Sequence, residues 1–237
     1  MLKIRLLNGG LGNQIFQTSH AFREGISVGI FFDRKRALSK EVKKLYKVCF
    51  DFSKIPILRN ILYYFWHETA TVSCKKYAFI ELFSGYSLNS NYIDLPFSKE
   101  IEKLFEISKP LSKISTLHLR LTDYVQLGRG TLSNKHTIPD LHYFKILKTD
   151  APESEEVQSL INEFGFKLDC KEPIDDWCDI ISSDEVVCSN STFSISAALI
   201  GQILYGNTFY VPSQPEVEFR HEALMKYNDS FYRVKVV

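Results

Sequence analysis

The stretch GGLGNQIF, near the start of the chain, could bind an anion through its backbone. The residues that suggest this chemistry are Gly9, Gly10, Gly12, Asn13 and Gln14. Glycines allow a tight turn, and they expose the N–H groups that open the following helix, where the helix dipole favours negative charge. The spacing matches neither the dinucleotide fingerprint GxGxxG nor a P-loop. The alternative is a glycine turn that only lets a helix approach a strand.

A second stretch, LHLRLTDY at 117–124, could hold a diphosphate. His118, Arg120 and Thr122 alternate with leucines, so a strand would carry the polar side chains on one face. Arg120 suits a diphosphate because its planar guanidinium makes bidentate, charge-assisted hydrogen bonds. Asp123, at the end of the strand, could orient that arginine or accept a proton. The alternative is an exposed edge strand with a surface ion pair.

A third stretch, SNSTFS, follows the apolar run EVVC and opens a helix rich in small residues. Its members are Ser189, Asn190, Ser191, Thr192, Phe193 and Ser194. Hydroxyl and amide N–H groups at the N-terminus of a helix suit phosphate oxygens. The alternative is plain N-capping by serine or asparagine, which any helix can use.

Each stretch lies at or just beyond the end of a predicted strand, which is where open α/β sheets bind their ligands. In the first half, the hydrophobic pattern predicts strands at 2–7 and from 26, extended chain at 77–88, and helices at 13–24, 39–67 and 97–107. In the second half it predicts strands at 114–121, 144–148, 185–190 and 203–212, a helix capped by Asp150 and ended by Gly165, and a helix at 191–201. The pattern therefore predicts two α/β domains, 1–110 and 111–237.

The composition is that of a soluble globular protein, with 237 residues of which 45% are apolar and 24% charged. The net charge of +1 gives no overall basic field, which argues against nucleic acid as a partner. Five cysteines without a CxxC pair argue against a disulfide framework and against a zinc site. Because the chain starts with no signal peptide, we expect a cytoplasmic protein with reduced thiols.

The most apolar segment, IPILRNILYYFW at 55–66, contains Arg59 and Asn60 and is too short to span a bilayer. We expect it to form a helix in the core. The alternative is peripheral contact with the inner face of a membrane, because aromatic side chains also suit the lipid interface.

In their order and distances, GGLGNQIFQ, HLRLTDY and SNSTFS resemble the α-1,2-fucosyltransferases of glycosyltransferase family 11. FSGYSLNSNYI at 83–93 is similar to a further segment of that family, and the resemblance extends from Leu6 to about Pro212. It implies a GT-B fold, in which two Rossmann-like domains face a cleft. It also implies metal-independent, inverting transfer of fucose from GDP-fucose to a galactose-type hydroxyl of a glycan, without a cofactor. In bacteria the glycan would be a lipopolysaccharide or O-antigen precursor.

The resemblance also implies roles for the three stretches. Arg120 would bind the donor diphosphate, while His118 and Asp123 would shape its pocket. Residues 190–194 would contact the nucleotide, and the glycine turn at 9–14 would form the lip of the donor cleft in the first domain. The catalytic base remains open among Asp123, Asp150 and Asp184.

The chain departs from the family pattern at identifiable places. Leu121 stands where the family has a second arginine, Ile195 and Ser196 replace a pair of tryptophans, and the segment 142–152 is shorter by the length of a helix. Two alternatives therefore accompany the fucosyltransferase hypothesis. One is a transferase for another nucleotide sugar, and the other is a nucleotide- or glycan-binding protein without catalysis.

Overall fold

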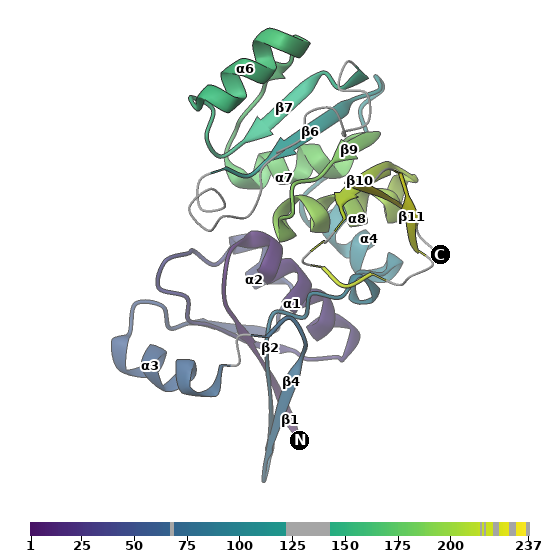
Figure 1. The fold of residues 1–237 in the computed structure, drawn as a ribbon. Coiled ribbons are helices and arrows are strands. Elements are labelled where there is room, and N and C mark those ends of the chain that lie inside the picture. The colour runs from purple at the N-terminus through teal and green to yellow at the C-terminus, as the bar shows by residue number, and fades with distance from the viewer. Residues whose placement is uncertain are drawn as a thin grey trace. The chain divides into compact units, whose positions relative to one another are not determined.

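The structure is a computed structural model that describes residues 1–66, 69–121, 143–213, 215, 217–219, 223–227 and 231–235. It divides into two compact units, Met1–Phe105 and Glu106–Val237 (Figure 1). Each unit is built on a mixed β-sheet with helices, which confirms the predicted α/β class. The sequence predicts the boundary between residues 110 and 111, five residues later than the structure has it.

The first unit has a five-stranded sheet in the order β3-β2-β1-β5-β4. Its strands are β1 (Leu2–Leu7), β2 (Val28–Phe31), β3 (Val48–Asp51), β4 (Ser73–Tyr77) and β5 (Ile80–Ser84). All neighbouring pairs are parallel except β4 and β5, which form an antiparallel hairpin. The central strand β1 ends in the buried residues Arg5, Leu6 and Leu7, as expected for a parallel strand covered on both faces.

The helices of the first unit confirm part of the prediction. They are α1 (Leu11–Arg23), α2 (Lys40–Lys44), α3 (Pro56–Phe65), the 3₁₀ helix η1 (Ser90–Tyr92) and α4 (Leu95–Leu104). The predicted βαβ unit is present as β1-α1-β2. The expectation of a mostly helical segment at 39–67 is wrong in its middle, because Val48, Cys49 and Phe50 favour a strand and extend the sheet beside β2 as β3.

Helix α3 corrects a second expectation. The sequence predicts a core helix at 55–66, but no residue of α3 is buried. The helix lies on the flank of the first unit (Figure 1).

The second unit has a seven-stranded sheet in the order β11-β12-β10-β9-β6-β7-β8. Its strands are β6 (Ser115–Leu119), β7 (Ile146–Thr149), β8 (Lys167–Leu168), β9 (Glu185–Val187), β10 (Thr208–Pro212), β11 (Leu224–Lys226) and β12 (Phe231–Val234). Strands β8, β7, β6, β9 and β10 run parallel, so their carboxyl ends share one edge of the sheet. Strands β12 and β11 return antiparallel.

The helices in the described residues of the second unit are α6 (Glu155–Phe164), α7 (Pro173–Ser182) and α8 (Thr192–Tyr205). The prediction for α6 is right about its end, where Gly165 adopts the left-handed conformation with φ 70°. It is wrong about its start, because Ser154 caps the helix by accepting a hydrogen bond from the Val157 N–H. Asp150 instead accepts from a backbone N–H at the end of β6.

Helix α7 is absent from the sequence prediction and packs on α8. Its Trp177 is fully buried and donates a hydrogen bond from Nε1 to Ser196 Oγ over 3.0 Å. Ile195 is also fully buried. The positions where family 11 has its tryptophan pair thus lie in the core of this unit.

Candidate functional site

Two of the three candidate stretches meet at the carboxyl edge of the second sheet. His118 lies on β6, and Ser189 follows the neighbouring parallel strand β9. His118 Nδ1 and Ser189 Oγ are 2.8 Å apart, which is a hydrogen bond. His118 and Ser189 are far apart in the sequence, but β6 and β9 are neighbours in the sheet. Because the two strands run parallel, their carboxyl ends lie at the same edge.

His118 is a buried, neutral imidazole. Its ring stacks on Phe193, with ring centroids 5.4 Å apart and an angle of 29° between the planes. Burial lowers the pKa of His118 to about 4, although the Asp150 carboxylate acts in the opposite direction. At neutral pH His118 can therefore offer or accept a hydrogen bond, but it carries no positive charge.

The start of α8 holds the third stretch together. Ser191 is the N-cap, and its hydroxyl accepts a hydrogen bond from the Phe193 N–H. Ser194 donates to the carbonyl oxygens of Ser189 and Ser191, each over 3.4 Å. N-capping therefore accounts for Ser191, while Asn190 and Thr192 are half-buried at the same helix end.

The leucines and the polar residues of LHLRL lie on opposite faces, as the alternation predicts. Leu117, Leu119 and Leu121 belong to the hydrophobic cluster of the second unit. Arg120 follows β6 at the carboxyl edge and is half-buried. The position of the second family arginine, Leu121, faces the core and is 3% exposed.

The structure places two of the three carboxylates proposed as catalytic bases, Asp150 and Asp184, at opposite edges of the second sheet. Asp150 follows β7 at the carboxyl edge, where its Oδ1 accepts from the Leu121 N–H over 2.8 Å. Asp184 precedes β9 at the opposite edge, where it pairs with Lys109 at 3.0 Å and accepts from the Ile114 N–H. These two contacts lower the pKa of Asp184 despite partial burial. Asp123, like Thr122, lies outside the described residues.

The glycine turn in the first unit is partly filled by the chain itself. Gly9 has φ 88°, and a Cβ added there would lie 2.5 Å from Asn13 Nδ2. The Gly9 N–H donates to Asp33 Oδ2 over 2.9 Å. A carboxylate of this protein therefore occupies the position where an external anion would meet that N–H.

The remainder of the turn differs from Gly9. Gly10 is the N-cap of α1 with an ordinary φ of −71°, no side chain caps the helix, and a Cβ added at Gly10 would meet no atom within 4 Å. Gly12 is buried inside the helix. The amide of Gln14 is buried and bonds Gly9, Ala37 and Ser39 of the same unit, so its polar side chain is used in the fold.

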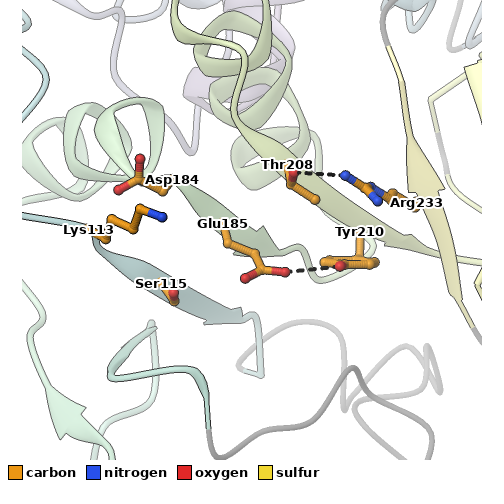
Figure 2. A pocket seen from close by; sticks show the side chains of 7 residues that line it. All are labelled: Lys113, Ser115, Asp184, Glu185, Thr208, Tyr210 and Arg233. Carbon is orange, nitrogen blue, oxygen red and sulfur yellow. Dashed lines mark hydrogen bonds between the residues drawn. The ribbon is translucent and has the colours of Figure 1, made fainter.

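A pocket of about 380 Å³ opens at the amino edge of the second sheet, away from the predicted residues. Figure 2 shows the side chains that line it: Lys113, Ser115, Asp184, Glu185, Thr208, Tyr210 and Arg233. Tyr210 donates to Glu185 Oε1 over 2.9 Å, and Arg233 donates to Thr208 Oγ1 over 3.3 Å. No sequence pattern indicated this pocket, because its residues come from four separate segments and most of these polar groups bond one another.

Within the part of the chain that the structure describes, no group of three or more histidine, cysteine, aspartate or glutamate side chains could hold a metal ion. No helix in the described ranges has the length and hydropathy needed to cross a membrane. No family model matches the chain, and no curated protein or solved structure matches it.

Proposed function

We propose that the protein is an inverting glycosyltransferase that moves fucose from GDP-fucose to a galactose-type hydroxyl of a glycan. The observation that carries the proposal is the junction of the second and third stretches at one edge of the second sheet, through the His118–Ser189 hydrogen bond. This is the edge at which open α/β sheets bind nucleotides. The finer architecture, GT-B with a donor cleft between two Rossmann-like domains, is part of the same proposal.

The chemistry needs few groups from the protein. The acceptor hydroxyl attacks the anomeric carbon, a base takes its proton, and the bond to GDP breaks with its electron pair on the leaving diphosphate. Arg120 would stabilise the diphosphate charge, and the N–H groups that open α8 would add to it. In the first unit, the uncapped N-terminus of α1 would be a further anion-binding group.

The positions of Asp150 and Asp184 narrow the choice of catalytic base. Asp184 lies at the edge opposite His118, so we exclude it from this site. Asp150 remains, because it follows β7 beside the end of β6, and Asp123 remains from the motif.

Calorimetric titration with GDP tests the donor site. We expect Arg120→Ala to weaken GDP binding by at least about tenfold, since a charge-assisted hydrogen bond to phosphate contributes roughly 1.5–3 kcal/mol. The matched control is Arg233→Ala, which removes an exposed arginine at the amino-edge pocket and should leave GDP affinity unchanged. Equal affinities of wild type and Arg120→Ala would remove Arg120 from the donor site.

A second candidate is a nucleotide-binding protein that does not transfer sugar. It is favoured by Leu121, which packs in the core where family 11 has a second cation for the leaving group. The discriminating result is stabilisation by GDP with no consumption of GDP-fucose under any acceptor. Consumption of a different nucleotide sugar would instead support transfer with another donor.

A further inference from the structure

Helix α3 presents an apolar face to solvent. Ile57 is 74% exposed, Ile61 49% and Tyr64 79%, and these positions recur at helical spacing with Leu58 beside them. Each lies on the outward side of a helix in which no residue is buried. Monomeric soluble proteins rarely expose a large contiguous apolar patch, and such patches commonly mark interaction surfaces.

The inward side of α3 fixes the helix to the unit. Tyr63 and Trp66 pack edge-on against Phe32, with ring centroids 5.0 and 5.5 Å away. Arg59 donates to the Ser53 carbonyl. Because these contacts are all on one side, Ile57, Ile61 and Tyr64 are held outward.

The exposed apolar face continues from α3 to the hairpin β4-β5. The Phe65 ring contacts Tyr64 and also Tyr77 of β4, with centroids 5.4 and 6.1 Å away. Lys75 Nζ lies 5.9 Å above the Phe65 ring. At the hairpin turn Phe79 is 81% exposed.

The first unit is strongly basic, although the whole chain is almost neutral. Residues 1–105 contain 16 lysines and arginines against 9 aspartates and glutamates, and residues 106–237 contain 13 against 19. The most basic segment of the chain is 34–47, which precedes β3 and α3 in the sequence. Its exposed cations are Arg34, Lys35, Arg36, Lys40, Lys43, Lys44 and Lys47.

We propose that the first unit docks on an anionic lipid bilayer, with the outward face of α3 entering the interface and the basic segment 34–47 facing the lipid headgroups. An exposed apolar helix face on a basic unit combines the two features that bind such surfaces, apolar area and lysine or arginine charge. The cations supply attraction to negative headgroups, and the isoleucines and tyrosine supply buried apolar area. This proposal is independent of the transfer reaction.

The chemistry of the face favours lipid over nucleic acid. Aliphatic side chains such as Ile57 and Ile61 give a nucleic acid neither hydrogen bonds nor a stacking platform. In a bilayer the same side chains leave water, and Tyr64 occupies the interfacial position that aromatic residues prefer.

Vesicle sedimentation tests the proposal with the full chain. We expect the protein to pellet with vesicles of phosphatidylcholine mixed with phosphatidylglycerol, and to stay mainly in the supernatant with phosphatidylcholine alone. We expect Ile57→Gln/Ile61→Gln and Lys43→Glu/Lys44→Glu each to weaken partitioning by at least about tenfold.

Two control variants make the same chemical changes elsewhere. Leu111→Gln/Met225→Gln removes exposed apolar side chains from the second unit, and Lys103→Glu/Lys167→Glu reverses two other exposed charges. Both should partition like wild type. A direct readout is Tyr64→Trp, whose fluorescence should shift to the blue and be quenched by brominated anionic lipid.

Three results would overturn the proposal. The first is no pelleting of wild type with anionic vesicles, and the second is equal pelleting of the α3 variant and wild type. The third is self-association in solution that Ile57→Gln/Ile61→Gln abolishes in the absence of vesicle binding, which would assign α3 to a second copy of the chain.

Discussion

Gly9 and Gly10 are neighbours in the chain, but the fold places a steric constraint only on the first. The φ of 88° at Gly9 lies in the left-handed region, and Asn13 fills the space that a Cβ would need. At Gly10 both the backbone and the surrounding space would accept a side chain. The fold alone therefore explains one of the two glycines, and proximity to a ligand is our explanation for the other.

Replacing each glycine by serine distinguishes a requirement of the fold at Gly9 from a requirement of ligand binding at Gly10. We expect Gly9→Ser to lower the free energy of unfolding by about 1–3 kcal/mol, because serine is strained at that φ and would collide with Asn13. We expect Gly10→Ser to change it by less than about 0.5 kcal/mol, since serine is a good N-cap, while GDP affinity falls. Denaturant unfolding and calorimetric titration measure the two quantities. Equal destabilisation by both variants would mean that the fold requires both glycines.

We expect the protein to lose stability in mild acid because two of its histidines are buried. Burial lowers the pKa of His118 to about 4 and that of His20 to about 3, where nearby Arg5 contributes to the lowering. The unfolded chain binds these protons near pH 6.5 and the folded chain does not, so stability falls as pH drops from 6.5 toward 4. His118 alone accounts for about 3 kcal/mol at the lower end.

Denaturant unfolding at a series of pH values measures how steeply the free energy of unfolding falls with decreasing pH. We expect this pH dependence to be weaker in His20→Leu, whatever the stability of that variant at neutral pH. An unchanged slope in His20→Leu would show that His20 is protonated in the folded protein.

At the scale of secondary structure, a buried lysine ties three elements of the second unit together. Lys148 on β7 contacts Asp176 at 2.6 Å and Asp179 at 2.8 Å on α7, and Asp169 beyond β8 at 3.4 Å. The carboxylates raise the pKa of Lys148 against the opposing effect of burial. Because a buried charge is costly when unpaired, we expect this cluster to fix how α7 packs on the sheet.

Lysine-to-methionine substitutions test the cluster. Lys148→Met leaves buried Asp176 without its cation, and we expect it to lower the free energy of unfolding by about 3–5 kcal/mol. Lys171→Met removes a half-exposed partner of Asp179, and we expect a loss below about 1 kcal/mol. Thermal and denaturant unfolding compare the variants, and similar losses for both would contradict a special role for the buried lysine.

The sequence predicts some elements better than others for physical reasons. The β1-α1-β2 unit was predictable, because glycines separate an apolar strand from a helical pattern. Helix α7 has recognisable sequence signals, namely Pro173 at its start, Asp175 and Asp176 in its first turn and Trp177 facing the core. Strand β3 was hidden, because four residues at a sheet edge leave too short a pattern.

In the candidate site too, features set by neighbouring residues could be predicted from the sequence, whereas contacts between distant segments could not. The alternation in LHLRL correctly assigned the leucines to the core and His118 to the other face. The internal role of Gln14 could not be read from its position, because its partners Ala37 and Ser39 come from a distant loop. Strand order also decided which of Asp150 and Asp184 shares an edge with His118.

At the scale of the whole molecule, charge is distributed unevenly between the two units, and the net charge of +1 conceals this. The basic first unit carries the exposed face of α3, whereas the acidic second unit carries the junction of the LHLRL and SNSTFS stretches. We therefore expect membrane binding and donor binding to respond to different substitutions. Ile57→Gln/Ile61→Gln should leave GDP affinity unchanged, and Arg120→Ala should leave vesicle binding unchanged.

The central claim is transfer of fucose, and its most direct test is the release of GDP from GDP-fucose by the purified protein with a panel of galactose-terminated acceptors. We expect release that depends on the acceptor, that is lost in Arg120→Ala and that is kept in Arg233→Ala. GDP-fucose that stays intact with every acceptor, while GDP still stabilises the protein against heat, would contradict the claim.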